Sequence, residues 1–212
     1  MKSNIIEITE EFVKGIHKHD SSGHDFAHIN RVRKLALYIG KREGADLFIV
    51  EMAALLHDTV DEKLFNEQSS WERLDHFYAT IGLSDAHIAQ INHILCYVSF
   101  KGGANEGKLK SLEGFVVQDA DRIDALGAIG IARTFMFAGK FGEAMYDPET
   151  KPREDLSNYR TPGTAINHFY EKLFKLIHLM NTETGRQIAQ SRNDYMQQFI
   201  DIFLQEWYGE KL

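Results

Sequence analysis

Residues 46–58 read DLFIVEMAALLHD and decide the fold class of this chain. The stretch is apolar on almost every face of a helix until its last two residues, which is the pattern of a buried central helix. Before it, residues 26–39 place apolar side chains three or four positions apart, and Gly44 follows as a stop signal. No alternation of apolar and polar residues extends over four or more positions, and no internal repeat is visible. The sequence therefore predicts an all-α fold of about seven to nine helices.

Proline placement separates the chain into two parts. Its three prolines, Pro148, Pro152 and Pro162, fall within one short stretch. Proline breaks helix interiors, so the preceding part of the chain can form long helices. From the apolar periodicity, further helices are predicted over 113–138, about 164–180 and about 183–208.

We expect one domain over 1–212, because two C-terminal helices cannot easily bury their own apolar faces. Its parts are a motif-bearing core over about 20–138, a loop over 139–163 and a C-terminal helical pair over 164–208 packed on the core. A division into two domains at the loop is the alternative. Long loops in compact domains often serve as lids or binding loops, and exposed connectors are the other common use.

Composition and charge limit the possible partners. The chain has 24 Lys and Arg against 31 Asp and Glu, a formal net charge of −7. Polymeric nucleic acid and anionic membranes need clustered positive charge, so neither is an expected partner, whereas a small nucleotide is compatible. No apolar run approaches the ~18 residues of a membrane span and no secretory signal opens the chain, so we expect a cytoplasmic protein. The single cysteine, Cys96, excludes a disulfide framework and is expected to be a small buried side chain.

Acidic and histidine side chains in apolar helices point to a metal ion. His57 and Asp58 end the apolar helix, where a charged carboxylate is costly unless it is paired or bound to a metal. Asp119, Asp121 and Asp124 lie close together on the 113–138 helix, and the last two share a face, where they repel unless a cation or an arginine lies between them. A buried divalent cation explains both patterns. Imidazole and carboxylate ligands suit manganese, which we expect first, with magnesium, iron, nickel, cobalt and zinc as alternatives.

A further histidine ligand is expected from the segment before residue 39. His24 and His28 are four residues apart, on one face of a helix that Ser21 or Ser22 is placed to cap. Either histidine has the placement of a ligand. We favour the interpretation in which His24 is a surface residue or contacts a ligand rather than the metal.

The order of one histidine, a His-Asp pair and one aspartate, on separate helices of an all-α chain, resembles the HD-domain superfamily of metal-dependent phosphohydrolases. The strings that carry the resemblance are GHDFAHINRVRKLA (23–36), AALLHDTVDEKL (53–64), VVQDADRIDALGAIGIARTF (116–135) and HFYEKLFKLIHLMNTETGRQIAQSR (168–192). They are similar to a compact, stand-alone bacterial branch with YpgQ-like and YedJ-like members. The resemblance implies an HD-domain helical bundle in which His28, His57, Asp58 and Asp121 hold one divalent metal ion. Asp124 is then expected to orient a ligand.

Two acidic residues follow the His-Asp pair. Asp61 and Glu62 resemble, in reversed order, the two acids that hydrolases of the stringent-response alarmone carry shortly after their HD pair. A carboxylate at this place can position the attacking water or take its proton. We therefore expect Asp61 and Glu62 to be catalytic, with solvated turn residues as the alternative.

Phosphate contacts are expected from cations near these motifs. Arg31 lies one helical turn after the first histidine, and Lys101 opens a glycine-rich loop. Arg122 follows the last aspartate directly, and Arg192 lies mid-helix among apolar residues. We expect these four residues to bind substrate, and each has a structural ion pair as its alternative.

His87 and His93 raise the question of a second metal ion. Some HD proteins use additional histidines between the His-Asp pair and the last aspartate for that purpose. On a helix, six residues of separation do not bring two side chains to one face. One metal ion is therefore expected, with a dinuclear site as the alternative.

The resemblance implies an enzyme that hydrolyses a phosphoanhydride or phosphoester of a nucleotide, with nucleoside triphosphate pyrophosphohydrolase or phosphatase activity considered first. One alternative is a non-catalytic regulatory module that binds metal and nucleotide, and the intact ligand set weighs against it. Another is an iron-dependent oxidative enzyme, which needs a second metal site. The sequence leaves open the base, the metal, the released product and whether the chain forms a homodimer.

Overall fold

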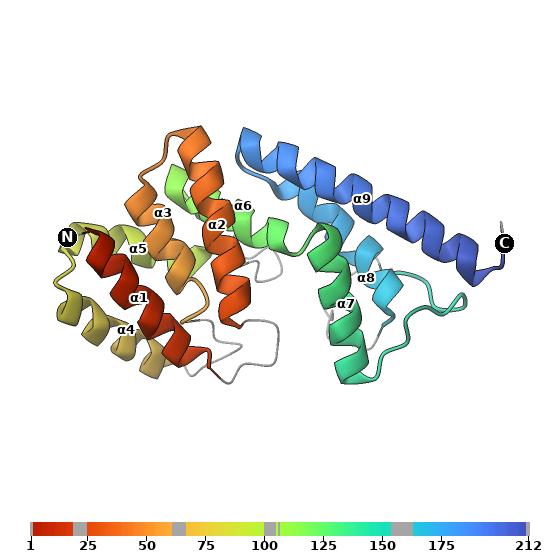
Figure 1. Cartoon of the computed structure of the whole chain (residues 1–212), viewed down its shortest axis with the longest axis horizontal. Helices are drawn as coiled ribbons and strands as arrows, with labels where there is room; N and C mark the ends of the chain where they lie inside the picture. The colour runs from red at the N-terminus through yellow and green to blue at the C-terminus, as the bar shows by residue number, and fades with distance from the viewer. Residues whose placement is uncertain are drawn as a thin grey trace. The chain divides into compact units, whose positions relative to one another are not determined.

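A computed structural model describes residues 2–18, 25–60, 67–99, 105, 107–153 and 163–210. Within these ranges the chain is helical, with an isolated bridge between Ala144 and Thr164 and no strand, so the all-α prediction is confirmed (Figure 1). In the same ranges, no helix is long and apolar enough to cross a membrane. The helices are α1 (Lys2–Ile16), α2 (Phe26–Glu43), α3 (Leu47–Leu56), α4 (Glu67–Ile81), α5 (Asp85–Tyr97), α6 (Leu112–Asp124), α7 (Gly127–Phe141), α8 (Ala165–Glu171), the 3₁₀ helix η2 (Leu173–Leu179) and α9 (Glu183–Trp207).

The chain divides into two compact units, Met1–Ala120 and Asp121–Leu212. Helices α1 to α5 belong to the first unit and α7 to α9 to the second, and the boundary falls within α6. The two-domain alternative considered from the sequence put the boundary later in the chain, at the loop 139–163. One domain over 1–212 stays a prediction.

The first unit is built around α3. Every residue from Phe48 to Leu56 except Glu51 is buried, as the apolar run requires. Helices α2 and α3 run in opposite directions as a hairpin (Figure 1). Gly44 ends α2 with φ of 80°, a left-handed conformation that glycine adopts without strain. Asp46 then begins α3, because its Oδ1 accepts hydrogen bonds from the first free backbone N–H groups of that helix.

The second unit has an aromatic core around Phe135. The centroid of its ring lies 6.4 Å from that of Phe169, 6.0 Å from that of Phe199 and 6.2 Å from that of Phe203. These rings come from α7, α8 and α9, so one cluster joins all three helices. Aromatic rings at such distances bury large apolar areas and attract one another edge to face or offset.

Two predicted helices are interrupted. The helix predicted over 113–138 breaks after Asp124, and Gly127 begins the next helix with φ of 75°. A Cβ at Gly127 would lie 3.1 Å from Cγ of Arg192. The helix predicted over 164–180 ends at Glu171, because Lys172 leaves the helical conformation before η2 begins. Both breaks depend on tertiary packing or backbone geometry that apolar periodicity does not encode.

The prediction for Cys96 was wrong, since this residue is exposed. Helix α5 turns Ile91, Ile94 and Leu95 toward the core. Cys96 directly follows Leu95, so its side chain points about 100° away from that buried face. The exposed position follows from the helix register.

Candidate metal centre

His28 is held in the first turn of α2. The helix begins at Phe26, and Oδ1 of Asp25 accepts a hydrogen bond from the backbone N–H of His28 at 2.9 Å. The cap is therefore Asp25, and the prediction of Ser21 or Ser22 was wrong. An aspartate directly before a helix reaches the third N–H of the first turn, which otherwise has no partner. His28 is 1% exposed, so this anchored turn places an imidazole in the interior.

His57 and Asp58 follow the last turn of α3 and are 3% and 4% exposed. Nδ1 of His57 donates a hydrogen bond to the backbone carbonyl of Ala54 at 2.8 Å. Because a carbonyl oxygen only accepts, Nδ1 carries a proton, and Nε2 is the ring nitrogen left to bind a metal ion. This is the tautomer of a histidine that binds a metal through Nε2.

The turn after the His-Asp pair is fixed by two further hydrogen bonds. Oγ1 of Thr59 donates to the carbonyl of Leu56 at 2.7 Å, and Nη2 of Arg73 on α4 donates to the carbonyl of Thr59 at 3.3 Å. The carbonyls at the end of a helix lack helical partners, so such bonds stabilise the chain on leaving it. Asp58 therefore lies in an ordered part of the backbone.

The side chains of His28, His57 and Asp58 converge. The Nε2 atoms of the two histidines are 3.3 Å apart. The carboxylate of Asp58 lies 3.5 Å from Nε2 of His28 and 3.4 Å from Nε2 of His57. Among the described residues, they form the one group of three or more His, Cys, Asp or Glu residues whose ligand atoms lie within 4.8 Å of one another. Such separations occur between neighbouring ligand atoms on a metal with bonds of about 2.0–2.2 Å. Two imidazoles and a carboxylate therefore fit a divalent ion.

The aspartates of α6 differ in their surroundings. Asp119 is fully buried in the first unit. Asp124 is 1% exposed, and its Oδ2 accepts a hydrogen bond from Nη1 of Arg133 at 2.7 Å. An arginine thus contacts Asp124, which was one of the two possibilities that the sequence offered. Asp121 is half-buried and begins the second unit, so its role as the fourth ligand stays a prediction, as does the orienting role of Asp124.

Two of the four predicted phosphate-binding cations contact main-chain carbonyls of the second unit. Arg122 donates from Nη1 to Leu179, and Arg192 donates from Nη1 to Ile123 at 2.7 Å. These bonds give both arginines a structural role, and binding of substrate by them stays a prediction. Arg31 is half-buried on α2, one turn after the metal-binding candidate His28.

Four predicted site residues lie outside the described residues. They are the two acids expected to be catalytic, the glycine-loop lysine and the earlier of the two N-terminal histidines: Asp61, Glu62, Lys101 and His24.

The two histidines of α5 pack against aromatic rings. The ring of His87 lies 5.2 Å from that of Phe48, and the ring of His93 lies 5.1 Å from that of Tyr97. Neither histidine belongs to the convergent group of His28, His57 and Asp58. A mononuclear site therefore stays the preferred interpretation.

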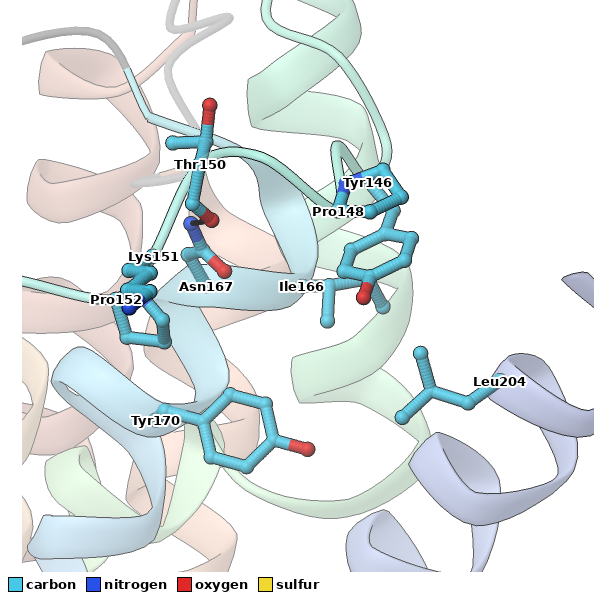
Figure 2. A pocket seen from close by; sticks show the side chains of 9 residues that line it. All are labelled: Tyr146, Pro148, Thr150, Lys151, Pro152, Ile166, Asn167, Tyr170 and Leu204. Carbon is cyan, nitrogen blue, oxygen red and sulfur yellow. Dashed lines mark hydrogen bonds between the residues drawn. The ribbon is translucent and has the colours of Figure 1, made fainter. Parts of the chain in front are cut away.

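A cavity of about 250 Å³ lies within the second unit (Figure 2). Its wall combines Tyr146 and Pro148 of the loop after α7 with Tyr170 of α8 and Leu204 of α9. The carbonyl of Thr150 accepts a hydrogen bond from Nδ2 of Asn167 at 2.8 Å, and this bond holds the loop on α8. The described residues that line the cavity include no carboxylate, histidine or cysteine, so the convergent group of the first unit is the stronger candidate for chemistry.

Comparison with known proteins identifies the family. The HD domain family matches residues 25–126, which include all four predicted metal ligands. The chain is also 41% identical to the protein YpgQ of Bacillus subtilis over 198 residues, covering 89% of this chain and 87% of YpgQ. The chain belongs to the HD-domain family. The recognition from the sequence is confirmed.

Similarity to solved structures extends over nearly the whole chain. An HD-superfamily hydrolase of Bacillus thuringiensis is 43% identical with a TM-score of 0.81, covering 99% of this chain and 100% of that one. A protein of Lactobacillus plantarum is 41% identical with a TM-score of 0.84, covering 98% of both chains. A crystal structure of B. subtilis YpgQ in complex with ADP is 39% identical with a TM-score of 0.76, covering 97% of this chain and 95% of that one. The HD-domain helical fold is thus confirmed over both units.

Proposed function

We propose that this HD-domain protein is a divalent-metal-dependent phosphohydrolase that cleaves a phosphoanhydride of a nucleoside triphosphate or diphosphate. The observation that carries the proposal is the convergence of His28, His57 and Asp58 in the interior of the first unit. A buried carboxylate beside two imidazoles is favourable when a cation is bound among them. The sequence pattern of the superfamily supports Asp121 as the fourth ligand.

Manganese is the metal that we expect first, with magnesium, iron, nickel, cobalt and zinc as alternatives. When bound, a divalent ion polarises a phosphoryl oxygen and makes a coordinated water more acidic. The residues around it determine which nitrogen atoms face it. Because the carbonyl of Ala54 holds the proton of His57 on Nδ1, the Nε2 lone pair remains available. Asp25 positions the other histidine, because its side chain caps the backbone turn from which His28 projects.

Similarity to YpgQ, which has been solved with ADP, supports a nucleotide as the substrate. The chain carries a formal net charge of −7, so a polyphosphate needs local positive charge at its binding site. Arg31 and Lys101 are the proposed phosphate-binding cations of the first unit. Arg122 and Arg192 are proposed to contribute from the second unit in addition to their main-chain bonds.

Asp61 or Glu62 is proposed to take up the proton that the attacking water loses. They follow the His-Asp pair within four residues, which supports a place near the reacting phosphate. Phosphoryl transfer depends mainly on positioning and charge neutralisation, so one metal ion, two or three cations and one proton acceptor suffice.

The experiment that tests this function measures metal content and nucleotide hydrolysis together. Metal-free protein is reconstituted with each candidate ion and supplied with a panel of nucleoside triphosphates, nucleoside diphosphates, alarmones and sugar phosphates. Phosphate and pyrophosphate are detected separately, which distinguishes stepwise cleavage from pyrophosphohydrolysis. We expect hydrolysis of at least one nucleotide only in the presence of a divalent ion.

Variants of the convergent group locate the activity. His57→Ala and Asp58→Ala are expected to lose both bound metal, measured by elemental analysis, and hydrolysis. His87→Ala is the matched control, because it removes a histidine of the same unit that packs against Phe48. Full metal occupancy in either ligand variant would overturn the site, and a metal-loaded wild type that hydrolyses nothing in the panel would favour the non-catalytic module.

A further inference from the structure

One arginine joins three helices of the first unit. Nε and Nη2 of Arg33 on α2 donate hydrogen bonds to Oε1 of Glu51 on α3 at 2.8 and 2.5 Å. Nη1 of the same guanidinium donates to Oε2 of Glu10 on α1 at 2.7 Å. The side chains of Arg33 and Glu51 are each 19% exposed, and that of Glu10 is 27% exposed. Charge-assisted bonds of this kind, made by a planar group in partly buried surroundings, are both strong and directional.

The ion pair and the histidine pair belong to the same hairpin. From the His28–His57 contact to the Arg33–Glu51 contact, the position advances five residues along α2 and moves back six residues along α3. Antiparallel helices in a constant register show this relation, and Figure 1 shows that α2 and α3 run in opposite directions. With a rise of 1.5 Å per residue, the two contacts lie about 8–9 Å apart along the hairpin.

We propose that Arg33, through Glu51, is a positioning residue that sets the register of α2 against α3 in which the metal ligands converge. The inference rests on the metal site of the proposed function. Apolar helix surfaces tolerate repacking when volume and pattern are kept, so they define a register weakly. The guanidinium fork fixes its carboxylate partner in direction as well as distance. A slide of one residue is about 1.5 Å, whereas metal–ligand distances vary by only about 0.2 Å.

Glu10 distinguishes positioning from simple stabilisation. It accepts a hydrogen bond from the same guanidinium at a similar distance, but α1 carries none of the predicted metal ligands. Loss of Glu10 removes this bond, together with an ion pair to Lys14 of the same helix at 2.7 Å, and leaves the α2–α3 tie in place. Glu51 and Glu10 are therefore a matched pair within one network.

The test compares Glu51→Leu with Glu10→Leu in the full chain. Each protein is freed of metal, its melting temperature is measured, and it is titrated with Mn²⁺ and with Zn²⁺. Glu51→Leu is expected to bind about ten- to a hundredfold more weakly than the wild type, the range found when residues that support metal ligands are lost. Glu10→Leu is expected to melt at a lower temperature and to keep the wild-type affinity. The visible absorption of bound Co²⁺ is expected to change in Glu51→Leu only.

Substitutions of the arginine give a second measurement. Arg33→Met is expected to weaken metal binding as Glu51→Leu does, and Arg33→Lys is expected to restore part of the affinity because it keeps the charge without the fork. If Glu51→Leu does not fold, the metal affinities of Arg33→Lys and Glu10→Leu are compared instead. Weaker binding in Arg33→Lys than in Glu10→Leu is then the expected result. Equal affinities for the wild type and the Arg33 and Glu51 variants, or an equal loss in Glu10→Leu, would overturn the positioning role alone. A wild type that binds none of these ions would overturn the proposed function and the positioning role with it.

Discussion

Buried carboxylates have different neighbours in the two units of this chain. In the second unit, Glu171 accepts hydrogen bonds from the backbone N–H, Nε and Nη2 of Arg153 at 2.9, 2.9 and 2.6 Å. In the first unit, Asp58 faces the Nε2 atoms of His28 and His57 at 3.5 and 3.4 Å. A guanidinium is always charged and supplies only donors, so its pair with a carboxylate is complete. Two imidazoles and a carboxylate are instead the kinds of group that bind a divalent ion.

The difference shows that burial alone does not identify a functional acid. Glu171 and Asp58 are 2% and 4% exposed, and exposure does not separate them. Their partners do, because an arginine is permanently charged and pairs with a carboxylate, whereas histidines beside a carboxylate are groups that also bind metal ions.

The largest expected effect on metal binding comes from α6, which carries both a predicted metal ligand, Asp121, and an arginine-paired acid, Asp124. Asp121→Asn is expected to abolish metal binding and hydrolysis, because a neutral amide replaces an anionic ligand. Asp124→Asn is expected to weaken metal binding about ten- to a hundredfold without abolishing it, because Asp124 is the residue expected to orient a ligand. It is also expected to lower stability by about 1–3 kcal/mol, because Arg133 loses its charged partner. Elemental analysis and thermal unfolding measure the two effects. Metal retained in Asp121→Asn but lost in Asp119→Asn would move the fourth ligand by two residues.

The next effect concerns the two acids after the His-Asp pair. If one of them takes a proton in the transition state, Asp61→Asn or Glu62→Gln is expected to lower turnover by about 10²–10⁴-fold. Metal affinity and folding are expected to remain those of the wild type, because neither acid is a predicted ligand. A solvated turn carboxylate would instead change stability by less than about 0.5 kcal/mol and leave turnover alone. Wild-type turnover in both single variants would remove these residues from the mechanism.

The fold class and the His-Asp pair could be predicted from sequence because both leave local signatures. The apolar run of α3 reveals a buried helix, and a charged pair at its end stands out against that background. The break before Gly127 could not be predicted, because apolar periodicity does not show that this glycine adopts a left-handed conformation, or that Arg192, far away in the chain, lies against it. Arg192 itself was expected to bind phosphate, and no sequence pattern shows that the carbonyl of Ile123 lies within its reach.

Only one partner of the Arg33–Glu51 ion pair stands out in the sequence. Glu51 is the one charged residue within α3, so its presence in an apolar run called for a partner. The partner lies 18 residues earlier on another helix that carries several basic residues. Choosing among them requires the register of the hairpin, which is a tertiary property.

A smaller effect, on stability alone, is expected from the arginine-paired acid of the second unit. Arg153→Met leaves Glu171 buried without its donors and is expected to lower the free energy of unfolding by about 3 kcal/mol. Metal affinity is expected to be unchanged, in contrast to the variants of the convergent group. Lys151→Met is the control, because it removes an exposed cation of the same loop. A loss of metal in Arg153→Met would show that the two kinds of buried acid are coupled.

The smallest expected effect is a pH dependence of stability that belongs to the second unit. Burial lowers the pKa of His168 in α8 from 6.5 to about 4, and the positive charge of Lys172 adds to the shift. The unfolded chain therefore binds a proton near pH 6.5 that the folded chain does not bind until about pH 4. Stability consequently falls as the pH falls through this window. Between pH 7.5 and pH 5, urea unfolding of the metal-free protein is expected to show a loss of about 2 kcal/mol from this group.

The variant His168→Phe isolates that contribution, because it keeps an enclosed ring and removes the titrating group. It is expected to lose about 2 kcal/mol less than the wild type between the two pH values. His76→Gln, which removes an exposed histidine of α4, is expected to keep the wild-type dependence. The ligand histidines are metal-free in all three proteins, so their contribution cancels in the differences. An equal loss in His168→Phe and wild type would mean that the His168 ring gains its proton as readily in the folded chain as in the unfolded one, contrary to its burial.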